Sequence, residues 1–285
     1  MNVATQERSA AVPVLEVVGG PGRLSRESFA ELWHFREVLW AFVVRQVKVR
    51  YKQAVVGIGW AIIQPVLAAL VFALFLFRYS SVPSEGVPAL LFTLAGMTGW
   101  TYFSSATALA SESLVTNQAL LRKIYFPREV LPLSGALAGV LDLLLALGVL
   151  VVVTFAYGIG PALSWVALPL PLLLLVVAAA AFGNGLSAIN VYYRDVRYAL
   201  PFVLQLGLFV SPIAYPLSVV PSSWRTIYAI LNPVAAATDS LRRIVVHGHW
   251  PDFPVLLASI GWSLFLLLCS YAFFKRLERG FSDRV

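Results

Sequence analysis

The sequence predicts an all-α membrane protein with six transmembrane helices, and three observations indicate this fold class. Of the 285 residues, 59% are hydrophobic and 12% are charged, whereas soluble domains carry roughly a quarter charged residues. Whole blocks contain no charge, such as the one between Lys52 and Arg78, and a helix needs roughly 20 apolar residues to cross a bilayer. The blocks lack the alternating polar residues of a membrane β-barrel, so the sequence favours helices.

Six apolar blocks reach the length that a membrane span requires. The third and fourth are one apolar stretch that Gly158 to Pro161 divides, because glycine and proline together interrupt helices. We expect a membrane domain over 54–275 and a cytoplasmic C-terminal tail over 276–285. The expected spans are about 54–77, 88–111, 130–156, 165–191, 198–218 and 253–274.

The positions of lysine and arginine predict the orientation, because these residues accumulate in cytoplasmic loops. With both termini in the cytoplasm, only Arg78, Arg225, Arg242 and Arg243 of the 21 Lys and Arg residues lie outside. The net charge of +7 then reflects topology and an affinity for anionic membrane lipids. It does not indicate nucleic-acid binding.

The N-terminal segment divides into two parts. Residues 1–27 are polar and interrupted by glycine and proline, which predicts a mobile cytoplasmic tail and not a secretory signal peptide. Over 28–53, apolar residues recur at helical spacing, and Arg45, Lys48 and Lys52 fall on a different face. This pattern predicts an amphipathic interface helix along the inner membrane surface. The alternative is a helix that packs on its own protein.

The segment between the second and third spans mixes apolar and basic side chains. It is long enough for a short helix that ends before Pro127, because a residue that precedes proline avoids helical geometry. Two interpretations remain open. The segment is either a docking surface for a partner protein or a loop against the lipid headgroups, with its arginines reaching toward water.

The segment from Ser211 to Asp252 is also unusual. The residues from Ser211 to Pro216 break the fifth span, and the apolar stretch from Trp224 to Ala237 is too short to cross the bilayer. Broken backbone at membrane depth is tolerated only inside protein or along a polar cavity. The pattern predicts re-entrant or interfacial helices on the outer side that form part of a conduit or gate. The alternative is an ordinary outer loop.

Asp142 is the only acidic residue inside an expected span, where a charge costs roughly 2.5–3.5 kcal/mol. We expect a structural partner, such as an arginine near a membrane edge or a backbone group. Proton coupling is the alternative. Cys269 is the single cysteine and lies in the last span, so the chain has no intramolecular disulfide.

The chain lacks the motifs of several enzyme classes. None of its four lysines follows a glycine, so there is no phosphate-binding loop for ATP. It has no HExxH motif and no arrangement of histidines that predicts a metal site. These absences argue against an intramembrane enzyme, and broken helices among six spans are typical of transporters.

Four stretches are specific enough to suggest a family. They are KVRYKQAVVGIGWAIIQP (Lys48 to Pro65), LLRKIYFPREVLPL (Leu120 to Leu133), NVYYRDVRY with LFVSPIAYP (Asn190 to Pro216), and LNPVAAATDSLRR (Leu231 to Arg243). In this order and spacing, the chain resembles the membrane permease of ABC exporters for polysaccharides and polyol phosphates. That group includes O-antigen, teichoic acid and galactan exporters, and the resemblance covers the chain from about residue 30 onward.

The resemblance implies a half-transporter in the bacterial plasma membrane. Two copies of the chain would pair, and two copies of a separate ATP-binding cassette subunit would carry ATP and Mg²⁺. A cytoplasmic coupling helix would lie at about Glu112 to Tyr125 and contact that subunit, and the segment from Pro216 to Val246 resembles the gate helices. The residues assigned to ATPase coupling are Asn117, Leu120, Leu121, Arg122, Lys123, Ile124, Tyr125, Phe126, Arg194 and Asp195.

The implied substrate is a lipid-linked polysaccharide that moves from the cytoplasmic to the outer side. The basic residues Arg45, Lys48, Arg50 and Lys52 lie where they would attract its pyrophosphate, or they bind membrane headgroups alone. Rings similar to those of sugar conduits suggest conduit or gate roles for Trp100, Tyr102, Phe103, Tyr215, Trp224 and Tyr228. The alternatives are an ABC exporter permease for drugs or haem, and an ion-driven carrier or channel without an ATPase.

Overall fold

The computed structural model describes residues 26–52, 57, 59–79, 86–278 and 280–281. Within these ranges the chain forms helices and their connections, without a strand. The expected N-terminal tail lies outside the described residues except for Arg26 and Glu27, which begin the first helix. The elements are α1 (Arg26–His34), α2 (Arg36–Lys52), α3 (Gly59–Tyr79), α4 (Ala89–Thr116), α5 (Gln118–Leu121), α6 (Val130–Ala138), α7 (Val140–Ala156), η1 (Leu163–Ala167), α8 (Pro169–Tyr192), α9 (Val196–Val210), η2 (Leu217–Val219), α10 (Ser222–Leu231), α11 (Pro233–Leu241), η3 (Arg242–Val246) and α12 (Phe253–Glu278).

Helices occupy all six expected apolar blocks, which confirms an all-helical chain with several apolar helices. Among the described residues, three helical segments are long and apolar enough to cross a membrane: Val130–Ala156, Leu163–Tyr192 and Phe253–Glu278. The apolar parts of α3 and α9 are shorter. The chain is therefore a membrane protein by its helices, and the arrangement of six spans remains a prediction.

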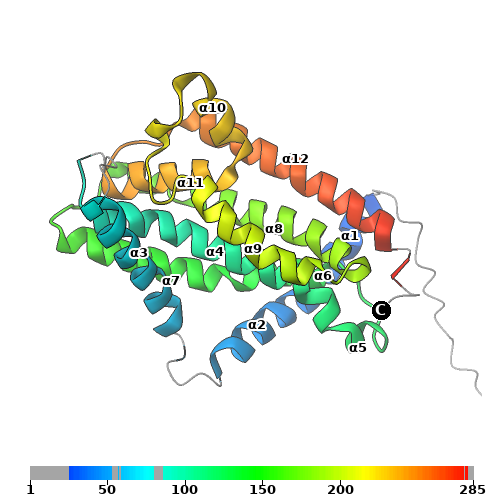
Figure 1. Cartoon of the computed structure of the whole chain (residues 1–285). Coiled ribbons are helices and arrows are strands. Elements are labelled where there is room, and N and C mark those ends of the chain that lie inside the picture. The colour runs from blue at the N-terminus through cyan, green and yellow to red at the C-terminus, as the bar shows by residue number, and fades with distance from the viewer. Residues whose placement is uncertain (1–25, 53–56, 58, 80–85, 279, 282–285) are drawn as a thin grey trace, which may run out of the picture.

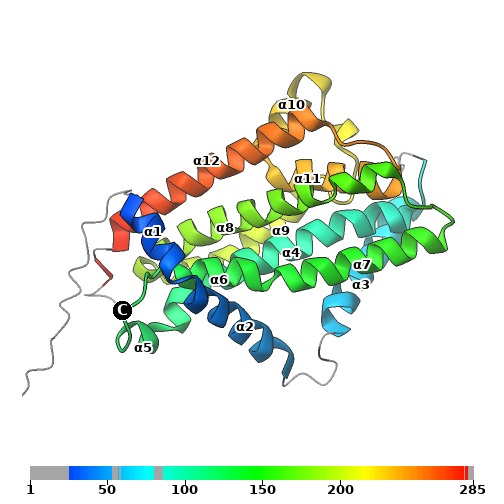
Figure 2. The same cartoon turned by 180° about the vertical axis from the view of Figure 1, so that it is seen from behind.

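The helix α4 lies at the centre of the bundle. It packs against α3, α6, α7, α8, α9 and α11, and α4, α7, α8 and α12 run lengthwise beside one another (Figures 1 and 2). Its side chains are buried along almost its whole length. Many of them are alanine, glycine, serine and threonine, and small residues of this kind let membrane helices approach closely.

Three helices approach closely around Ala110 of α4. A Cβ atom added to Gly135 of α6 would lie 2.8 Å from the Ala110 backbone, and one added to Gly183 of α8 would overlap the Ala110 side chain. Both glycines are buried. Three helices therefore meet at one alanine because two of them carry no side chain at the contact.

The C-terminal end of α4 differs from the prediction, and we call this end of the bundle the inner end because the sequence predicts that it is cytoplasmic. The helix continues past residue 111 to Thr116, and the expected coupling helix at Glu112 to Tyr125 is reduced to the four residues of α5. Asn117 separates the two helices, since both its backbone N–H and its side-chain amide donate to the Ser113 carbonyl, at 3.2 and 2.8 Å. An asparagine side chain that binds a nearby carbonyl competes with helix continuation.

The segment from Ser211 to Asp252, which is predicted to lie on the outer side and is called the outer segment below, contains helices. The choice between gate helices and an outer loop stays a prediction. The helix α9 ends at Val210 instead of near residue 218, because prolines follow at positions 212 and 216 and proline interrupts helices. The chain then forms η2, α10, α11 and η3. Asn232 begins α11 by accepting a hydrogen bond from the Ala235 N–H at 3.2 Å, with Pro233 in the first turn. Their depth in the membrane remains a prediction.

Arg242 fixes the bend between α9 and η2. The sequence places it in an outer loop, yet only 2% of its surface is exposed. Its guanidinium donates to the carbonyls of Pro212 at 2.9 Å, Phe92 at 3.2 Å, Tyr215 at 3.3 Å and also Ile213. It also stacks on the Phe92 ring. The charge is therefore compensated by backbone dipoles, which a buried charge requires.

We predict that Gly183→Ala destabilises the bundle, because the new methyl group overlaps Ala110. Overpacking of this kind costs about 1–3 kcal/mol, which should lower the apparent Tm of the protein in detergent. Gly148→Ala is the matched control, since a Cβ at Gly148 meets no atom within 4 Å. Equal apparent Tm values for the two variants would contradict the close α4–α8 contact.

Candidate functional site at the inner end of the bundle

The loop between α4 and α6 presents an exposed tip, which we define as Arg122 to Tyr125. Ile124 is 58% exposed and Tyr125 is 51% exposed. Leu120 and Leu121 are half-buried against the cluster beneath the loop. The tip thus combines two basic residues with two large apolar side chains that have surface available for a partner.

Phe126 anchors this loop and does not form part of its surface. It is 5% exposed and packs on Phe42 of α2, with ring centroids 5.4 Å apart. The adjacent Pro127 is also buried, so the predicted coupling role of Phe126 stays a prediction about a residue that is covered in this chain. Aromatic contacts of this kind contribute about 0.5–1.5 kcal/mol beyond their burial.

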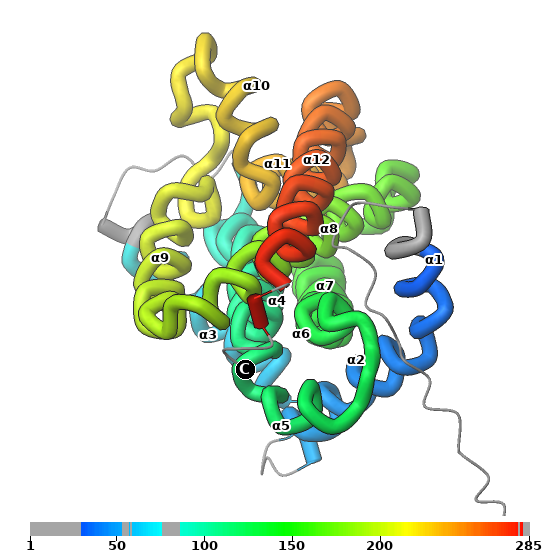
Figure 3. Tube along the Cα trace, turned by 90° about the vertical axis from the view of Figure 1, so that its right-hand side faces the viewer, coloured from blue at the N-terminus to red at the C-terminus, as the bar shows by residue number. Residues whose placement is uncertain are grey.

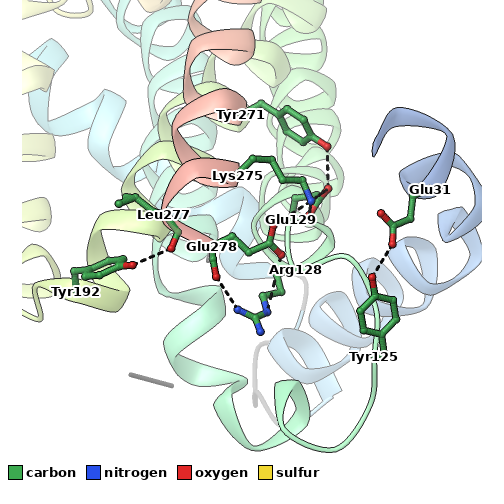
Figure 4. Close-up of polar contacts among 9 residues, drawn as sticks. All are labelled: Glu31, Tyr125, Arg128, Glu129, Tyr192, Tyr271, Lys275, Leu277 and Glu278. Carbon is green, nitrogen blue, oxygen red and sulfur yellow. Dashed lines mark hydrogen bonds and ion pairs between the residues drawn. The ribbon is translucent and has the colours of Figure 1, made fainter. Parts of the chain in front are cut away.

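The base of the loop is held to α12 by buried charges (Figure 4). Glu129 is completely buried, and its carboxylate accepts hydrogen bonds from Tyr271 Oη at 2.9 Å and Lys275 Nζ at 2.9 Å. Lys275 also pairs with Glu278 at 3.1 Å. Arg128 donates to the Glu278 carbonyl at 3.1 Å. Sequence reasoning missed this network, although Tyr271 and Lys275 stand four residues apart and therefore share one face of α12.

The helices α1 and α2 hold the loop from its other side. Tyr125 donates to Glu31 of α1 at 2.9 Å (Figure 4), and Arg45 of α2 donates to Asn117 at 3.3 Å. Burial, followed by the hydrogen bond to Glu31, raises the pKa of Tyr125. The hydroxyl therefore stays protonated near neutral pH and remains a donor.

Packing of α2 on its own protein is confirmed. Phe42 and Val43 are buried, α2 packs along α6, and Gln46 donates to Ser134 at 2.8 Å. Trp33 of α1 and Trp40 of α2 are 71% and 66% exposed. These two rings are available to contact lipid headgroups, and that contact stays a prediction.

The four predicted headgroup-binding cations have different surroundings. Arg50 pairs with Asp142, and Tyr51 donates a hydrogen bond to the same carboxylate. Burial, with help from Asp142, raises the pKa of Tyr51 to about 12. The expectation of an arginine partner for Asp142 is confirmed. The charge of Arg50 is therefore paired with Asp142. Lys48 and Lys52 are exposed.

A cavity of about 270 Å³ lies beside the Arg50–Asp142 pair, between α2, α3, α4 and α7. Trp60 and Gln64 of α3 line one side, and Tyr102 and Ser105 of α4 line the other. Trp60 is 53% exposed. The cavity combines aromatic rings with amide, hydroxyl and charged groups, which are the groups that bind sugars and phosphates.

Three of the predicted conduit residues lie in the core. Trp100 packs against Gly207 of α9, Phe103 packs against Phe182, and both rings are buried. Tyr102 donates to the Ala136 carbonyl at 3.0 Å. Trp100 and Phe103 pack between helices of one chain, and their role in a conduit stays a prediction. Tyr102 also lines the cavity beside Arg50 and Asp142.

The other three predicted gate residues lie together at the outer end. Tyr215 donates to the Val210 carbonyl at 2.6 Å, and Tyr228 of α10 donates to the same oxygen. Both tyrosines therefore satisfy the end of the broken α9 helix, as the termini of a helix require. Trp224 is 64% exposed on α10.

Arg194 and Asp195 form an exposed turn between α8 and α9. The preceding Tyr192 donates to the Leu277 carbonyl of α12 at 2.8 Å (Figure 4). This contact places the turn at the same end of the bundle as the loop tip. Figure 3 views that end, with the C-terminal end of α12 and the loop of α5 toward the viewer.

The family of the chain follows from its comparison with known sequences. The family described as ABC-2 type transporter matches residues 37–246. The chain belongs to this family. The match includes almost all of α2, the loop tip and the helices α10 and α11, and it ends before α12.

Curated relatives of this ABC-2 chain align over most of their length. The O-antigen export system permease protein RfbA of Myxococcus xanthus is 29% identical over 90% of this chain and 98% of the relative. A protein of the same name from Klebsiella pneumoniae is 30% identical over 88% and 96%. The polysialic acid transport protein KpsM of Escherichia coli is 24% identical over 84% and 93%.

The described part of the ABC-2 chain contains no group of three or more His, Cys, Asp or Glu side chains that could hold a metal ion. Its inner end combines charged pairs that fix segments, a loop tip with exposed apolar and basic groups, and the cavity beside Arg50 and Asp142. This arrangement can bind partners and transmit their movement.

We predict that Asp142→Ala lowers the apparent Tm in detergent, because it leaves the partly buried Arg50 guanidinium without its counter-charge. Arg50→Leu combined with Asp142→Leu should recover much of the loss, since apolar pairs often replace buried ion pairs without penalty. Glu112→Ala, at an exposed position, serves as the control. A stable Asp142→Asn variant that loses transport would instead favour proton coupling.

Proposed function

We propose that the chain is the membrane half of an ATP-driven exporter that moves a lipid-linked polysaccharide from the cytoplasmic to the outer side of a bacterial plasma membrane. Membership of the ABC-2 family and the similarity to O-antigen and polysialic acid transport proteins support this proposal. ATP hydrolysis takes place on a separate cassette subunit, with ATP and Mg²⁺ bound there. The chain itself has no phosphate-binding loop.

The observation that carries the proposal is the loop tip. Ile124 and Tyr125 are more than half exposed beside two basic residues, and large apolar side chains of this kind form the energetic centre of protein interfaces. The loop that carries them is fixed by Phe126 and Glu129. A rigidly held apolar knob is suited to a groove on the ATPase and can transmit force, whereas a mobile loop could not.

Two copies of the chain form the transporter. The helices α3 and α9 support this part of the proposal, because they lie side by side through Phe72 and Phe209, whose ring centroids are 6.5 Å apart. Each has a broad exposed apolar face, including Leu74 of α3 and Phe202 of α9. A conduit between two such faces needs no polar channel within one chain.

The substrate enters near α2. Lys48 and Lys52 are exposed there and attract a pyrophosphate at headgroup depth, and the cavity beside Trp60 and Gln64 offers a ring and an amide to a sugar. Both termini lie in the cytoplasm, which places these residues and the loop tip on the same side as the ATPase.

We predict that Ile124→Asp separates ATP hydrolysis from export, because a charge in the apolar centre of the contact weakens docking without entering the core. Tyr125→Ala should act in the same direction, whereas Tyr125→Phe keeps the ring and loses only the Glu31 bond. Export and glycan-stimulated ATPase are measured in the complete complex, with the membrane level of each variant as control. Normal export in both Ile124→Asp and Tyr125→Ala would contradict the docking role.

Deleting the gene tests the substrate class. We expect the cell surface to lose a polysaccharide and the cytoplasmic leaflet to accumulate its lipid-linked precursor, which surface-glycan and lipid analysis would measure. Unchanged glycans with altered sensitivity to drugs or haem would identify a drug or haem exporter. Purification without any ATP-binding subunit would instead identify an ion-driven carrier or channel.

A further inference from the structure

The inner end of α12 binds the base of the loop between α4 and α6, which we call the coupling loop, through a buried ion pair. Glu129 is 0% exposed, and the Lys275 side chain is 9% exposed. Tyr271, Lys275 and Glu278 lie at spacings of four and three residues, so they form one face of α12 (Figure 4). Two of them bind Glu129, and Glu278 binds Lys275 and Arg128.

Separating Lys275 from Glu129 is energetically unfavourable. Pulling Lys275 away from Glu129 would leave a carboxylate buried without its counter-charge, which is strongly unfavourable in a site that excludes water. The carboxylate also has a second donor, the Tyr271 hydroxyl, so its two oxygens are both satisfied. When the loop is displaced, the inner end of α12 is therefore expected to move with it.

The outer end of α12 contacts the outer helices. The helix α12 is continuous over 26 residues, which corresponds to about 39 Å at the α-helical rise. Near its beginning, Ser259 donates to the Ile230 carbonyl of α10 at 3.3 Å. The described contacts of α10 are mainly with α12, α11 and η2, and Figure 1 shows α12 running from α10 to the inner end of the bundle.

We propose that α12 connects the coupling loop to the outer helix α10, and that Glu129 and Lys275 are the positioning residues that attach it to the loop. The inference rests on the proposed function, because it assumes that an ATPase displaces the loop. The displacement passes from the coupling loop to α10 in three steps. The loop base moves Glu129, the ion pair moves α12, and α12 moves α10 through the contact at Ser259 and Ile230.

The test follows α10 while nucleotide changes at the opposite end. The complete complex in lipid nanodiscs carries Cys269→Ala, because the native cysteine is exposed, together with a reporter, Ser223→Cys, at an exposed position of α10. The rate of maleimide labelling is measured without nucleotide and after trapping with ATP and vanadate. We expect the rate in this parent protein to change severalfold between the two states.

The variants then interrupt the path at the ion pair. Lys275→Met and Glu129→Gln should abolish the difference in labelling between the two states, measured only in complexes that retain the ATPase and hydrolyse ATP. Lys275→Arg keeps a cation within reach of Glu129 and should preserve the difference. Arg276→Met is the matched control, because it removes an exposed cation one position further along α12.

The outcomes distinguish the proposed function from the proposed role of the Glu129–Lys275 ion pair. If Lys275→Met does not assemble, Glu129→Gln and Tyr271→Phe decide, since each removes an interaction with the carboxylate without a large change in shape. A parent that responds to nucleotide, with assembled variants that respond equally, overturns the role of the ion pair and leaves the proposed function intact. A parent that assembles with the ATPase and exports, but whose α10 labelling does not change with nucleotide, overturns this inference alone. A parent that binds no ATPase overturns both.

Discussion

A charged side chain buried in an apolar bundle must find its compensating partner inside the chain, because neither lipid nor the packed core can solvate it. Three sites in this protein meet that requirement, and each joins segments that are distant in sequence. Arg242 binds the carbonyls of the 212–215 bend and of Phe92 at the outer end. Asp142 binds Arg50 and Tyr51 beside α2, and Glu129 binds α12 at the inner end.

These buried charges help to fix the loop between α4 and α6 while its tip stays exposed. The loop tip is exposed, yet the residues on either side of it are held by Asn117, Phe126 and Glu129. The bundle behind it packs closely because glycines face Ala110. A partner that pushes on the tip therefore acts on a fixed loop and a dense core, and little of the movement is absorbed locally.

The large features of the fold could be predicted from the sequence, because they depend on the distribution of charge along the chain. The missing charges located a helix in each apolar block, the prolines after Val210 indicated the broken fifth helix, and the mixture of apolar and basic residues indicated the loop tip. The partner of Asp142 could be anticipated as well, since a lone acid in a span needs a cation.

Other features depend on contacts between distant segments, which periodicity does not reveal. Glu129 and Lys275 each border an uncharged block and resemble ordinary flanking charges, although they are buried against each other. Trp100 and Phe103 have the composition of a sugar-binding surface, but their rings fill the core. Whether such a residue is exposed is decided by how the helices pack.

The bend held by Arg242 has a consequence for how its sequence can vary. The guanidinium binds the carbonyl oxygens of Pro212, Ile213 and Tyr215, and every amino acid supplies such an oxygen. Ile213 and its neighbours are therefore open to substitution wherever packing allows, without loss of these bonds. Arg242 is not exchangeable even for lysine, because an ammonium group is compact and lacks the planar fork of five donors. Redesign of this outer face is best directed at the side chains of the bend, with the arginine left in place.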